Sequence, residues 1–276
     1  MTQQMTADRT KPDLGTVQET LLTPLCARAD QYGRPDAIVS DKRAMEIVRS
    51  MDYDFDKIRK FPDTLTGCAI RAAIFDRWIA EFLQGNGDAA VVLIGEGLDT
   101  TYDRNDDGRA EWFEIDFPDV IELRRQLIGT SDRRTMIAGS VFEKDWIDQV
   151  RSGGRSQILF QAAGVFMYLP EEKVRSLLGL LADHFPGATL LFDTCSTMAK
   201  RNSHRWEATV RTTNAVYQWG TDDPRSIAKW DGRFQVTDVE YMMNYHRHQW
   251  SLKTRFWSTV SADLRHGYQL NRAILG

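Results

Sequence analysis

Residues 91–99 of the chain are Val-Val-Leu-Ile-Gly-Glu-Gly-Leu-Asp, a run that predicts a strand followed by a tight turn. Its four apolar residues are typical of a buried parallel strand, and Gly95 and Gly97 then end that strand. A Gly-x-Gly turn lets a ligand approach the backbone, because side chains at those positions would collide with it. The stretch therefore predicts a ligand site at the carboxyl end of a strand.

The spacing around this turn indicates the kind of ligand. A dinucleotide fingerprint would place a third glycine three residues after Gly97, where this chain has Thr100. The next predicted strand, Ala110–Asp116, ends in an acid about twenty residues after the turn, the usual offset for a carboxylate that binds a ribose diol. These features favour a nucleoside without a diphosphate, of which S-adenosylmethionine is the commonest. Two alternatives remain open: a tight turn in an unrelated α/β domain and, despite the missing glycine, a nicotinamide dehydrogenase.

Beyond the turn, predicted strands alternate with predicted helices. The further strands are Ala110–Asp116, Thr135–Ala138, Ile158–Ala163 and Ala188–Phe192, and the helices begin at Pro118 or cover Asp145–Val150 and Glu171–His184. This alternation predicts an α/β fold with a Rossmann-like, doubly wound and mostly parallel sheet that binds ligands at the strand carboxyl ends. The positions at or just past such ends are Gly95, Asp116, Ser140, Ala163 and Asp193.

We expect a single domain over residues 1–276, in four parts. These parts are an N-terminal arm and helical lid (1–63), a cofactor-binding core (64–195), an inserted cap (196–247) and C-terminal strands (248–276). Helices are predicted over Thr16–Arg28, Ser40–Met51 and Thr64–Gln84, and residues 1–15 are predicted to be a mobile arm. The cap is predicted because its polar segment is too long for an ordinary connection. Residues Gln249–Leu275 are predicted to form two strands with a hairpin-like excursion between them.

Arg71 lies on the apolar side of the helix predicted over Thr64–Gln84. It shares that side with Ile74, Phe75, Trp78 and Ile79. A guanidinium buried there needs a partner, because burying an unpaired charge is costly. Two interpretations stay open: an internal salt bridge, for which Asp76 and Asp116 are available, and capture of a ligand carboxylate by the planar fork of donors.

Composition excludes several classes of protein. The 276-residue chain has a net charge of −4, which disfavours nucleic-acid binding, and its pairs Arg124-Arg125 and Arg133-Arg134 are predicted to be solvated faces. Its three cysteines are widely spaced, so we expect no disulfide framework or metal site and a reducing, cytoplasmic location. The polar N-terminus is unlike a secretory signal, and no apolar run is long enough for a membrane span.

Four segments, in order along the chain, carry a family resemblance. They are Arg71-Ala-Ala-Ile-Phe-Asp76, Ile94-Gly-Glu-Gly-Leu-Asp-Thr100, Trp112-Phe-Glu-Ile-Asp-Phe-Pro118 and Gly164-Val-Phe-Met-Tyr-Leu169. Together they resemble the leucine carboxyl methyltransferase family, including its bacterial branch of polyketide-type O-methyltransferases, over roughly residues 40–195. The resemblance implies a class I methyltransferase with S-adenosylmethionine as co-substrate, acting on a small molecule of secondary metabolism. It implies no nucleic-acid or membrane partner and leaves the oligomeric state open.

The resemblance also implies residue roles. Arg71 is implied to hold the methionyl carboxylate, and Asp116 to bind the ribose. The other implied cofactor-binding positions are Gly95, Glu96, Gly97, Phe117, Ser140, Val141 and Ala163. Three positions depart from the family pattern: Thr101 and Ser140 replace an arginine and an acid, and Ala163 replaces a glutamate that lies near the methionyl amine in the family.

The expected chemistry is an in-line methyl transfer, in which the enzyme mainly holds the reacting atoms collinear. A carboxylate acceptor is already ionised and needs no base, whereas a hydroxyl would want one. We expect O-methylation, of a carboxylate before a hydroxyl. The candidate catalytic residues are Tyr168, as an aromatic wall beside the sulfonium, and His246, with His248 beside it. Each also has a plainer interpretation: the tyrosine as a packing residue, and each histidine as an exposed or capping residue on a polar segment.

Two alternatives to methyl transfer remain open, and the first rests on the resemblance. With Ala163 in place of glutamate, the methionyl amine loses a negative neighbour that favours its protonated form. An unprotonated amine can attack the γ carbon of its own chain, which would form azetidine-2-carboxylate and methylthioadenosine. The other alternative is a relative that binds the nucleoside without turnover.

Overall fold

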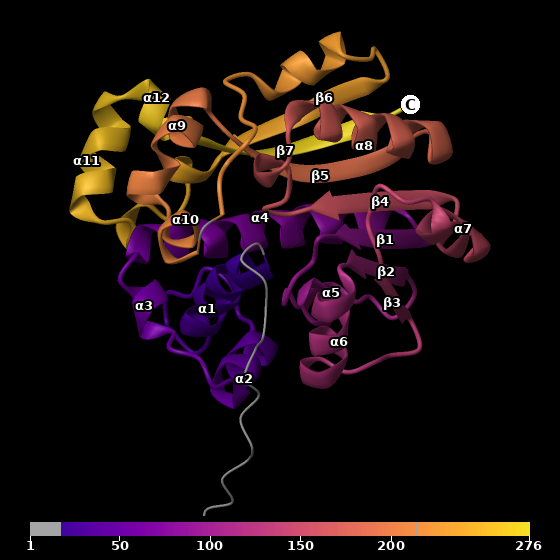
Figure 1. The fold of residues 1–276 in the computed structure, drawn as a ribbon, viewed down its shortest axis with the longest axis horizontal. Helices are drawn as coiled ribbons and strands as arrows, with labels where there is room; N and C mark the ends of the chain where they lie inside the picture. Colours follow the sequence, from indigo (N-terminus) through magenta and orange to yellow (C-terminus); the bar gives the residue numbers. More distant parts are fainter. Residues whose placement is uncertain (1–17, 214) are drawn as a thin grey trace, which may run out of the picture.

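The computed structural model, which describes residues 18–213 and 215–276, is built around one seven-stranded mixed sheet (Figure 1). The strands are β1 (Ala89–Ile94), β2 (Glu111–Asp116), β3 (Arg134–Ala138), β4 (Gln157–Ala162), β5 (Ala188–Cys195), β6 (Phe234–Tyr241) and β7 (Tyr268–Leu275). Their order is β3-β2-β1-β4-β5-β7-β6. The first five pair in parallel, and β7 is antiparallel to both of its neighbours. This confirms the predicted Rossmann-like, mostly parallel sheet.

Helices connect the strands and extend the two ends of the chain. They are α1 (Leu22–Gln31), α2 (Lys42–Ser50), α3 (Asp56–Arg59), α4 (Pro62–Gly85), α5 (Thr101–Asn105), α6 (Pro118–Leu127), α7 (Asp145–Ser152), α8 (Glu171–His184), α9 (Thr197–Trp206), α10 (Ala208–Thr212), α11 (Leu252–Val260) and α12 (Ala262–Arg265). Short 3-10 helices are η1 (Gln18–Leu21), η2 (Phe166–Tyr168), η3 (Pro224–Lys229), η4 (Met242–Asn244) and η5 (Arg247–Gln249). The predicted arm, residues 1–15, lies outside the described residues.

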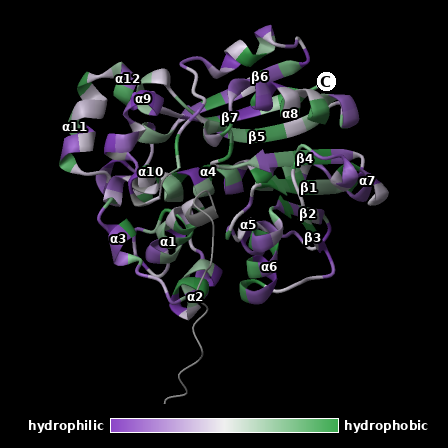
Figure 2. Ribbon diagram, in the orientation of Figure 1, coloured by the Kyte–Doolittle hydropathy of each residue, from purple (hydrophilic) through white to green (hydrophobic). Residues whose placement is uncertain are grey.

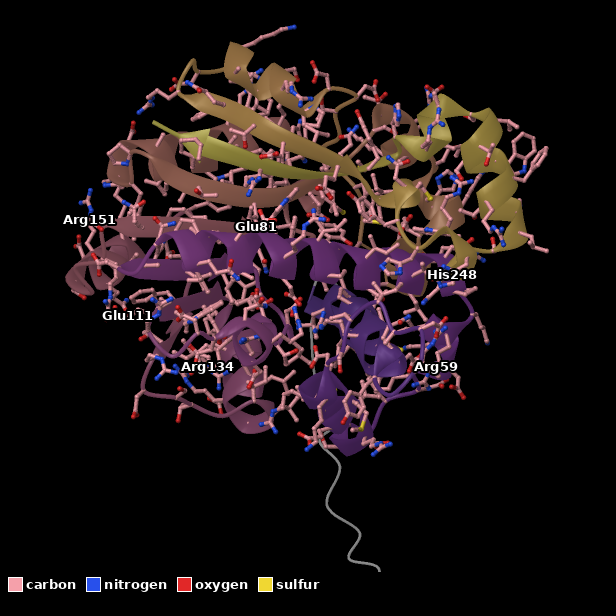
Figure 3. The ribbon with its side chains drawn as sticks, turned by 180° about the vertical axis from the view of Figure 1, so that it is seen from behind. Arg59, Glu81, Glu111, Arg134, Arg151 and His248 are labelled. Carbon is pink, nitrogen blue, oxygen red and sulfur yellow. The ribbon has the colours of Figure 1, made fainter. Side chains whose placement is uncertain are left out.

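The sheet is buried on both faces, as a parallel sheet requires. One face packs against the apolar side of α4, and the other packs against α7, α8 and η3. Figure 1 shows α8 in front of the sheet, and the view from behind in Figure 3 shows α4 on the opposite side. The strands that these helices cover are largely hydrophobic (Figure 2). Within the described residues, no helix combines the length and apolar character needed to cross a membrane.

The N-terminal helices α1, α2 and α3 form a separate small core beside the sheet. Leu98 and Leu123 join that core to the turn after β1 and to α6. A charged contact strengthens the junction, because the buried Arg28 on α1 donates to Asp41 at 3.0 Å and to Asp99 at 3.0 Å. These N-terminal helices, for which we keep the name lid together with η1, are therefore fastened directly to the glycine-turn region of the core.

The prediction for the C-terminal part is wrong in two places. The segment 196–247, predicted to be only a cap, contains β6, whose residues Phe234, Val236, Val239 and Tyr241 alternate with polar ones around a bulge. The segment 248–276, predicted to be strands, contains α11 and α12 before its single strand β7. Leu252, Phe256 and Val260 recur every four residues, and Ser251 caps α11, so this sequence has helical periodicity.

Candidate functional site

A cavity of about 610 Å³ opens where β1, β4 and β5 end. Its floor includes the turn 95–99 after β1, the backbone at Ala163 and Gly164 after β4, and Asp193 near the end of β5. Thr20, Leu21 and Arg28 of the lid line it, as do residues from α9 to β7. In Figure 1 the lid helices and the group α9–α12 lie on the same side of the sheet. The cavity therefore lies at the predicted edge, between the lid and the C-terminal segments.

The glycines of the turn are required by their backbone conformation and by close packing. Gly95 and Gly97 have φ angles of +62° and +57°, which other residues rarely adopt. A Cβ atom on Gly97 would lie 2.8 Å from the Cβ of Leu21, and one on Gly95 would lie 2.8 Å from Val165. The turn is thus held tightly between the lid and the loop after β4.

Arg124, a residue of α6, holds the turn through hydrogen bonds to its carbonyl oxygens. Its Nη1 donates to the carbonyl oxygens of Gly97 at 2.7 Å and Asp99 at 2.9 Å, and its Nη2 lies 2.6 Å from a carboxylate oxygen of Glu114. Both charged side chains are fully buried. The prediction that the Arg124-Arg125 pair is a solvated face is therefore wrong for Arg124. The charge of Glu114 and the two carbonyls offset the cost of burying this guanidinium.

Arg71 points into the cavity and is paired with Asp193. Its Nη1 donates to Asp193 at 2.8 Å, and the other carboxylate oxygen of Asp193 accepts a hydrogen bond of 2.6 Å from the amide of Gly164. The partners named from the sequence, Asp76 and Asp116, are wrong, because Asp76 binds Arg104 instead. Within the described residues, Nε and Nη2 of Arg71 have no hydrogen-bond partner, so the guanidinium retains donors for a ligand carboxylate.

Asp116 is tied to the glycine turn. Its two carboxylate oxygens accept the amides of Gly97 at 2.7 Å and Phe117 at 2.8 Å. Burial raises the pKa of Asp116, and the two amide hydrogen bonds oppose that rise. Each oxygen keeps a second lone pair, which suits a ribose diol. The predicted ribose position is therefore chemically suitable.

The predicted cofactor residues fall into two groups that meet at this Gly97–Asp116 hydrogen bond. The cavity group comprises Arg71, Gly95, Glu96, Gly97 and Ala163. The second group, which we name the β2–β3 shelf, comprises Asp116, Phe117, Ser140 and Val141, which do not line the cavity. The ends of β2 and β3 are joined in this shelf, because the amide of Gly139 donates to the carbonyl of Asp116. Phe117 on the shelf is 48% exposed.

Glu96 is a buried carboxyl group at the cavity. It is 6% exposed, and its Oε1 has no hydrogen-bond partner within the described residues. Burial raises its pKa well above the ordinary value, repulsion from Asp99 adds to that rise, and Arg124 opposes it. Ala163 lines the same cavity, at the position where the family pattern has a glutamate.

The structure separates the two predicted catalytic residues. Tyr168 lines the cavity, and its ring packs edge-on against Tyr217 with centroids 5.3 Å apart. His246 is exposed and does not line the cavity. Its ring lies 6.1 Å from that of His248, which Figure 3 labels at the periphery of the molecule. The structure therefore does not bring His246 to the cavity.

Sequence reasoning missed several cavity residues. Glu207, between α9 and α10, lines the cavity with Cys68, Tyr217 and Tyr268. The Tyr268 hydroxyl donates to the Glu207 carboxylate. No local motif marks these positions, because they come from segments far apart in the sequence. Asp193 had a weak signal, since it follows a predicted strand, but its pairing with Arg71 is not visible in the sequence.

The residues present fit a nucleoside joined to an amino acid. The positive-φ turn lines the cavity, and Gly95 and Gly97 bring backbone without side chains to its wall. Arg71 lines the cavity together with this turn and has donors for a carboxylate, whereas Asp116 accepts the amide of Gly97 and has lone pairs for a diol. The donor set therefore matches S-adenosylmethionine, which carries both groups.

Comparisons with known proteins identify the family of the chain. Residues 9–182 match the family described as leucine carboxyl methyltransferase. The chain is 34% identical over 212 residues to the tetracenomycin polyketide synthesis O-methyltransferase TcmP of Streptomyces glaucescens, covering 76% of this chain and 77% of that one. It is 26% identical over 242 residues to the S-adenosyl-L-methionine-dependent methyltransferase dpfgK of Gibberella zeae, covering 80% and 81%.

A solved structure shares the fold. A Thermobifida fusca protein described as a methyltransferase superposes with a TM-score of 0.60 at 16% identity, covering 96% of this chain and 95% of that chain. The family match extends over more than half of the 276 residues and includes the glycine turn, Arg71 and Asp116. The chain thus belongs to the leucine carboxyl methyltransferase family and is an S-adenosylmethionine-dependent methyltransferase.

Proposed function

We propose that the protein transfers the methyl group of S-adenosylmethionine to an oxygen atom of a small metabolite of secondary metabolism. The observation that carries this proposal is one continuous cavity, which joins the glycine turn and Arg71 to a cluster of tyrosines. Such a cavity has room for a co-substrate and a second molecule in contact. The relative TcmP, named as a polyketide O-methyltransferase, supports oxygen as the acceptor.

In this proposal the two halves of the co-substrate are held by different groups. The free donors of Arg71 bind the methionyl carboxylate, and Asp116 binds the ribose hydroxyls. The β2–β3 shelf supports the adenine, with Phe117 available for stacking. Tyr168 offers an aromatic face toward the positively charged sulfonium. Holding these parts aligned in a water-poor cavity is the main requirement of a displacement at carbon.

Product analysis tests the proposal. The purified protein is incubated with S-adenosylmethionine alone and then with a metabolite extract, and products are identified by mass spectrometry. We expect S-adenosylhomocysteine together with a compound heavier by one methylene, and no turnover without the extract. Methylthioadenosine formed from S-adenosylmethionine alone would indicate the cyclisation alternative instead, which the methyltransferase relatives do not support.

Calorimetry addresses the non-catalytic alternative separately. We expect binding of both S-adenosylmethionine and S-adenosylhomocysteine. Binding without any methylated product would favour a nucleoside-binding relative, whereas no binding of either compound would contradict the assigned site.

A further inference from the structure

The tyrosine cluster of the cavity surrounds a carboxyl group that the cofactor site does not use. Tyr168, Tyr217 and Tyr268 belong to one small apolar cluster with Met167 and Cys195. Glu207 lies among them at the cavity wall and accepts the hydrogen bond of the Tyr268 hydroxyl. Glu207 precedes β6 and Tyr268 follows it, so the tertiary structure forms this contact between distant parts of the chain.

The charges around the cavity disfavour a carboxylate acceptor. Its basic lining residues are Arg28, Arg71 and Lys253. Arg28 is committed to Asp41 and Asp99, Arg71 is paired with Asp193, and Lys253 is exposed on α11.

Acids outnumber these bases. The acidic lining residues are Asp63, Glu96, Asp99, Asp193 and Glu207. Asp99 and Asp193 are the partners of Arg28 and Arg71, whereas the other three form no salt bridge with a described residue. Glu207 forms no salt bridge with any described residue. Its neighbours in the tyrosine cluster are phenols, one of which donates a hydrogen bond to it. A second carboxylate beside Glu207 would meet like charge, whereas a hydroxyl would find an acceptor for its hydrogen bond.

We propose that Glu207 accepts the proton of a hydroxyl group on the methyl acceptor, so that the acceptor is a neutral phenol or alcohol. This inference rests on the proposed function and narrows its substrate class. In the step, the hydroxyl oxygen forms a bond to the methyl carbon while the carbon–sulfur bond breaks. The electron pair of that bond stays on sulfur as a thioether, and the hydroxyl proton moves to the Glu207 carboxylate. Atoms and charge balance without a further reactant.

The electrostatics of the cluster suit a base. Burial raises the pKa of Glu207 above its usual value, while the hydrogen bonds from Tyr268 and Thr64 and the charge of Arg71 oppose that rise. A carboxylate whose pKa is raised toward neutrality is a stronger proton acceptor near pH 7.

Apart from Arg71, the titratable groups that face Glu207 are thiols and phenols. Burial raises the pKa values of all of them, and they are Cys68, Tyr168, Cys195, Tyr217 and Tyr268. Glu207 is therefore the proton acceptor among them. Tyr268 acts through Glu207 and is a positioning residue.

Matched test compounds decide the acceptor class. We would use 2-naphthol and 2-naphthoate, which share a ring system and differ in hydroxyl against carboxylate. Binding is measured by calorimetry with S-adenosylhomocysteine present, and methyl transfer is measured by mass spectrometry. We expect the wild-type protein to prefer 2-naphthol and to form its methyl ether.

Variants then test the role of Glu207. For Glu207→Gln we expect kcat to fall by about 100- to 10,000-fold with little change in KM, and the acidic limb of the kcat/KM pH profile to disappear. For Tyr268→Phe we expect that limb to move to higher pH, because a hydrogen bond that lowers the Glu207 pKa is lost. Glu171→Gln, at an exposed carboxylate on α8, is the matched control and should behave as wild type.

The outcomes separate this inference from the proposed function. Preference for 2-naphthoate with an ester product that Glu207→Gln still forms would overturn the inference and keep O-methylation. Failure of the wild type to bind or methylate 2-naphthol would also overturn it. Retained S-adenosylhomocysteine binding by Glu207→Gln shows that the variant is folded. A wild-type protein that binds neither S-adenosylmethionine nor S-adenosylhomocysteine would instead refute the proposed function.

Discussion

The guanidinium of Arg71 lies directly against the backbone of Gly164. A Cβ atom on Gly164 would come within 2.6 Å of Nη1 of Arg71, and the φ angle of Gly164 is +73°. The same glycine donates its amide to Asp193, the ion-pair partner of Arg71. The loop after β4 therefore sets both the position of the arginine and that of its carboxylate partner, and it leaves no room there for any side chain.

Gly164→Ala tests this packing. We expect it to weaken S-adenosylmethionine binding roughly tenfold or more, or about 1.4 kcal/mol, because the added methyl group displaces Arg71. Gly33→Ala is the control, since Gly33 has a φ of +81° and nothing within 4 Å of its Cβ position. That control should cost only the strain of the left-handed conformation, about 1–2 kcal/mol of unfolding free energy. Equal affinity in the two variants, measured by calorimetry, would contradict the displacement.

Arg71→Lys tests the fork of donors while it keeps the charge opposite Asp193. Lysine is a point charge and lacks the planar fork that matches a carboxylate. We expect a loss of about 1.5–3 kcal/mol in S-adenosylmethionine binding, the scale of a hydrogen bond to a charged group. Arg77→Lys, at a half-exposed arginine on the same helix, should bind as wild type in the same titration. An unchanged affinity for Arg71→Lys would mean that the methionyl carboxylate is held elsewhere.

Much of the core was predictable because its signals are local. The apolar run before Gly95 and the pattern of α8 each reflect burial of neighbouring residues, and the predicted bounds Glu171–His184 match the helix. The carboxyl-end positions follow from the rules of parallel sheets, so the cavity could be placed without side-chain detail.

The remainder of the site depends on contacts between distant residues. Arg71 and Asp193 are separated by 122 positions, and no local pattern links them. Arg124 looks like a surface residue in the sequence, because its burial depends on Glu114 and on backbone carbonyls of the turn. Glu207 lies in a polar segment, and only the tertiary structure brings it to Tyr268. Helix α11, by contrast, had a local signal in the spacing of its apolar residues and in its capping serine, and the strand prediction overlooked it.

Asp116 predicts a pH dependence of co-substrate binding. Its pKa is raised by burial, and only the ionised form accepts both ribose hydroxyls. Affinity for S-adenosylmethionine is therefore full above this raised pKa and falls as the pH drops through it, at a higher pH than for an ordinary aspartate. Asp116→Asn should lose about 1–3 kcal/mol of binding and this pH dependence. The exposed Glu122→Gln is the control in a calorimetric pH series. A wild-type affinity that stays flat down to the ordinary aspartate range argues against Asp116 as the ribose ligand.

Arg124 links the stability of the core to the shape of the glycine turn. Arg124→Leu leaves the carboxylate of Glu114 buried without its cation, so we expect about 3–5 kcal/mol less unfolding free energy in urea denaturation. The double variant Arg124→Leu, Glu114→Leu removes both charges and should recover most of that stability. It still removes the donor to the carbonyls of Gly97 and Asp99, so its S-adenosylmethionine affinity should remain low. Recovery of affinity together with stability would show that the turn holds its shape without Arg124.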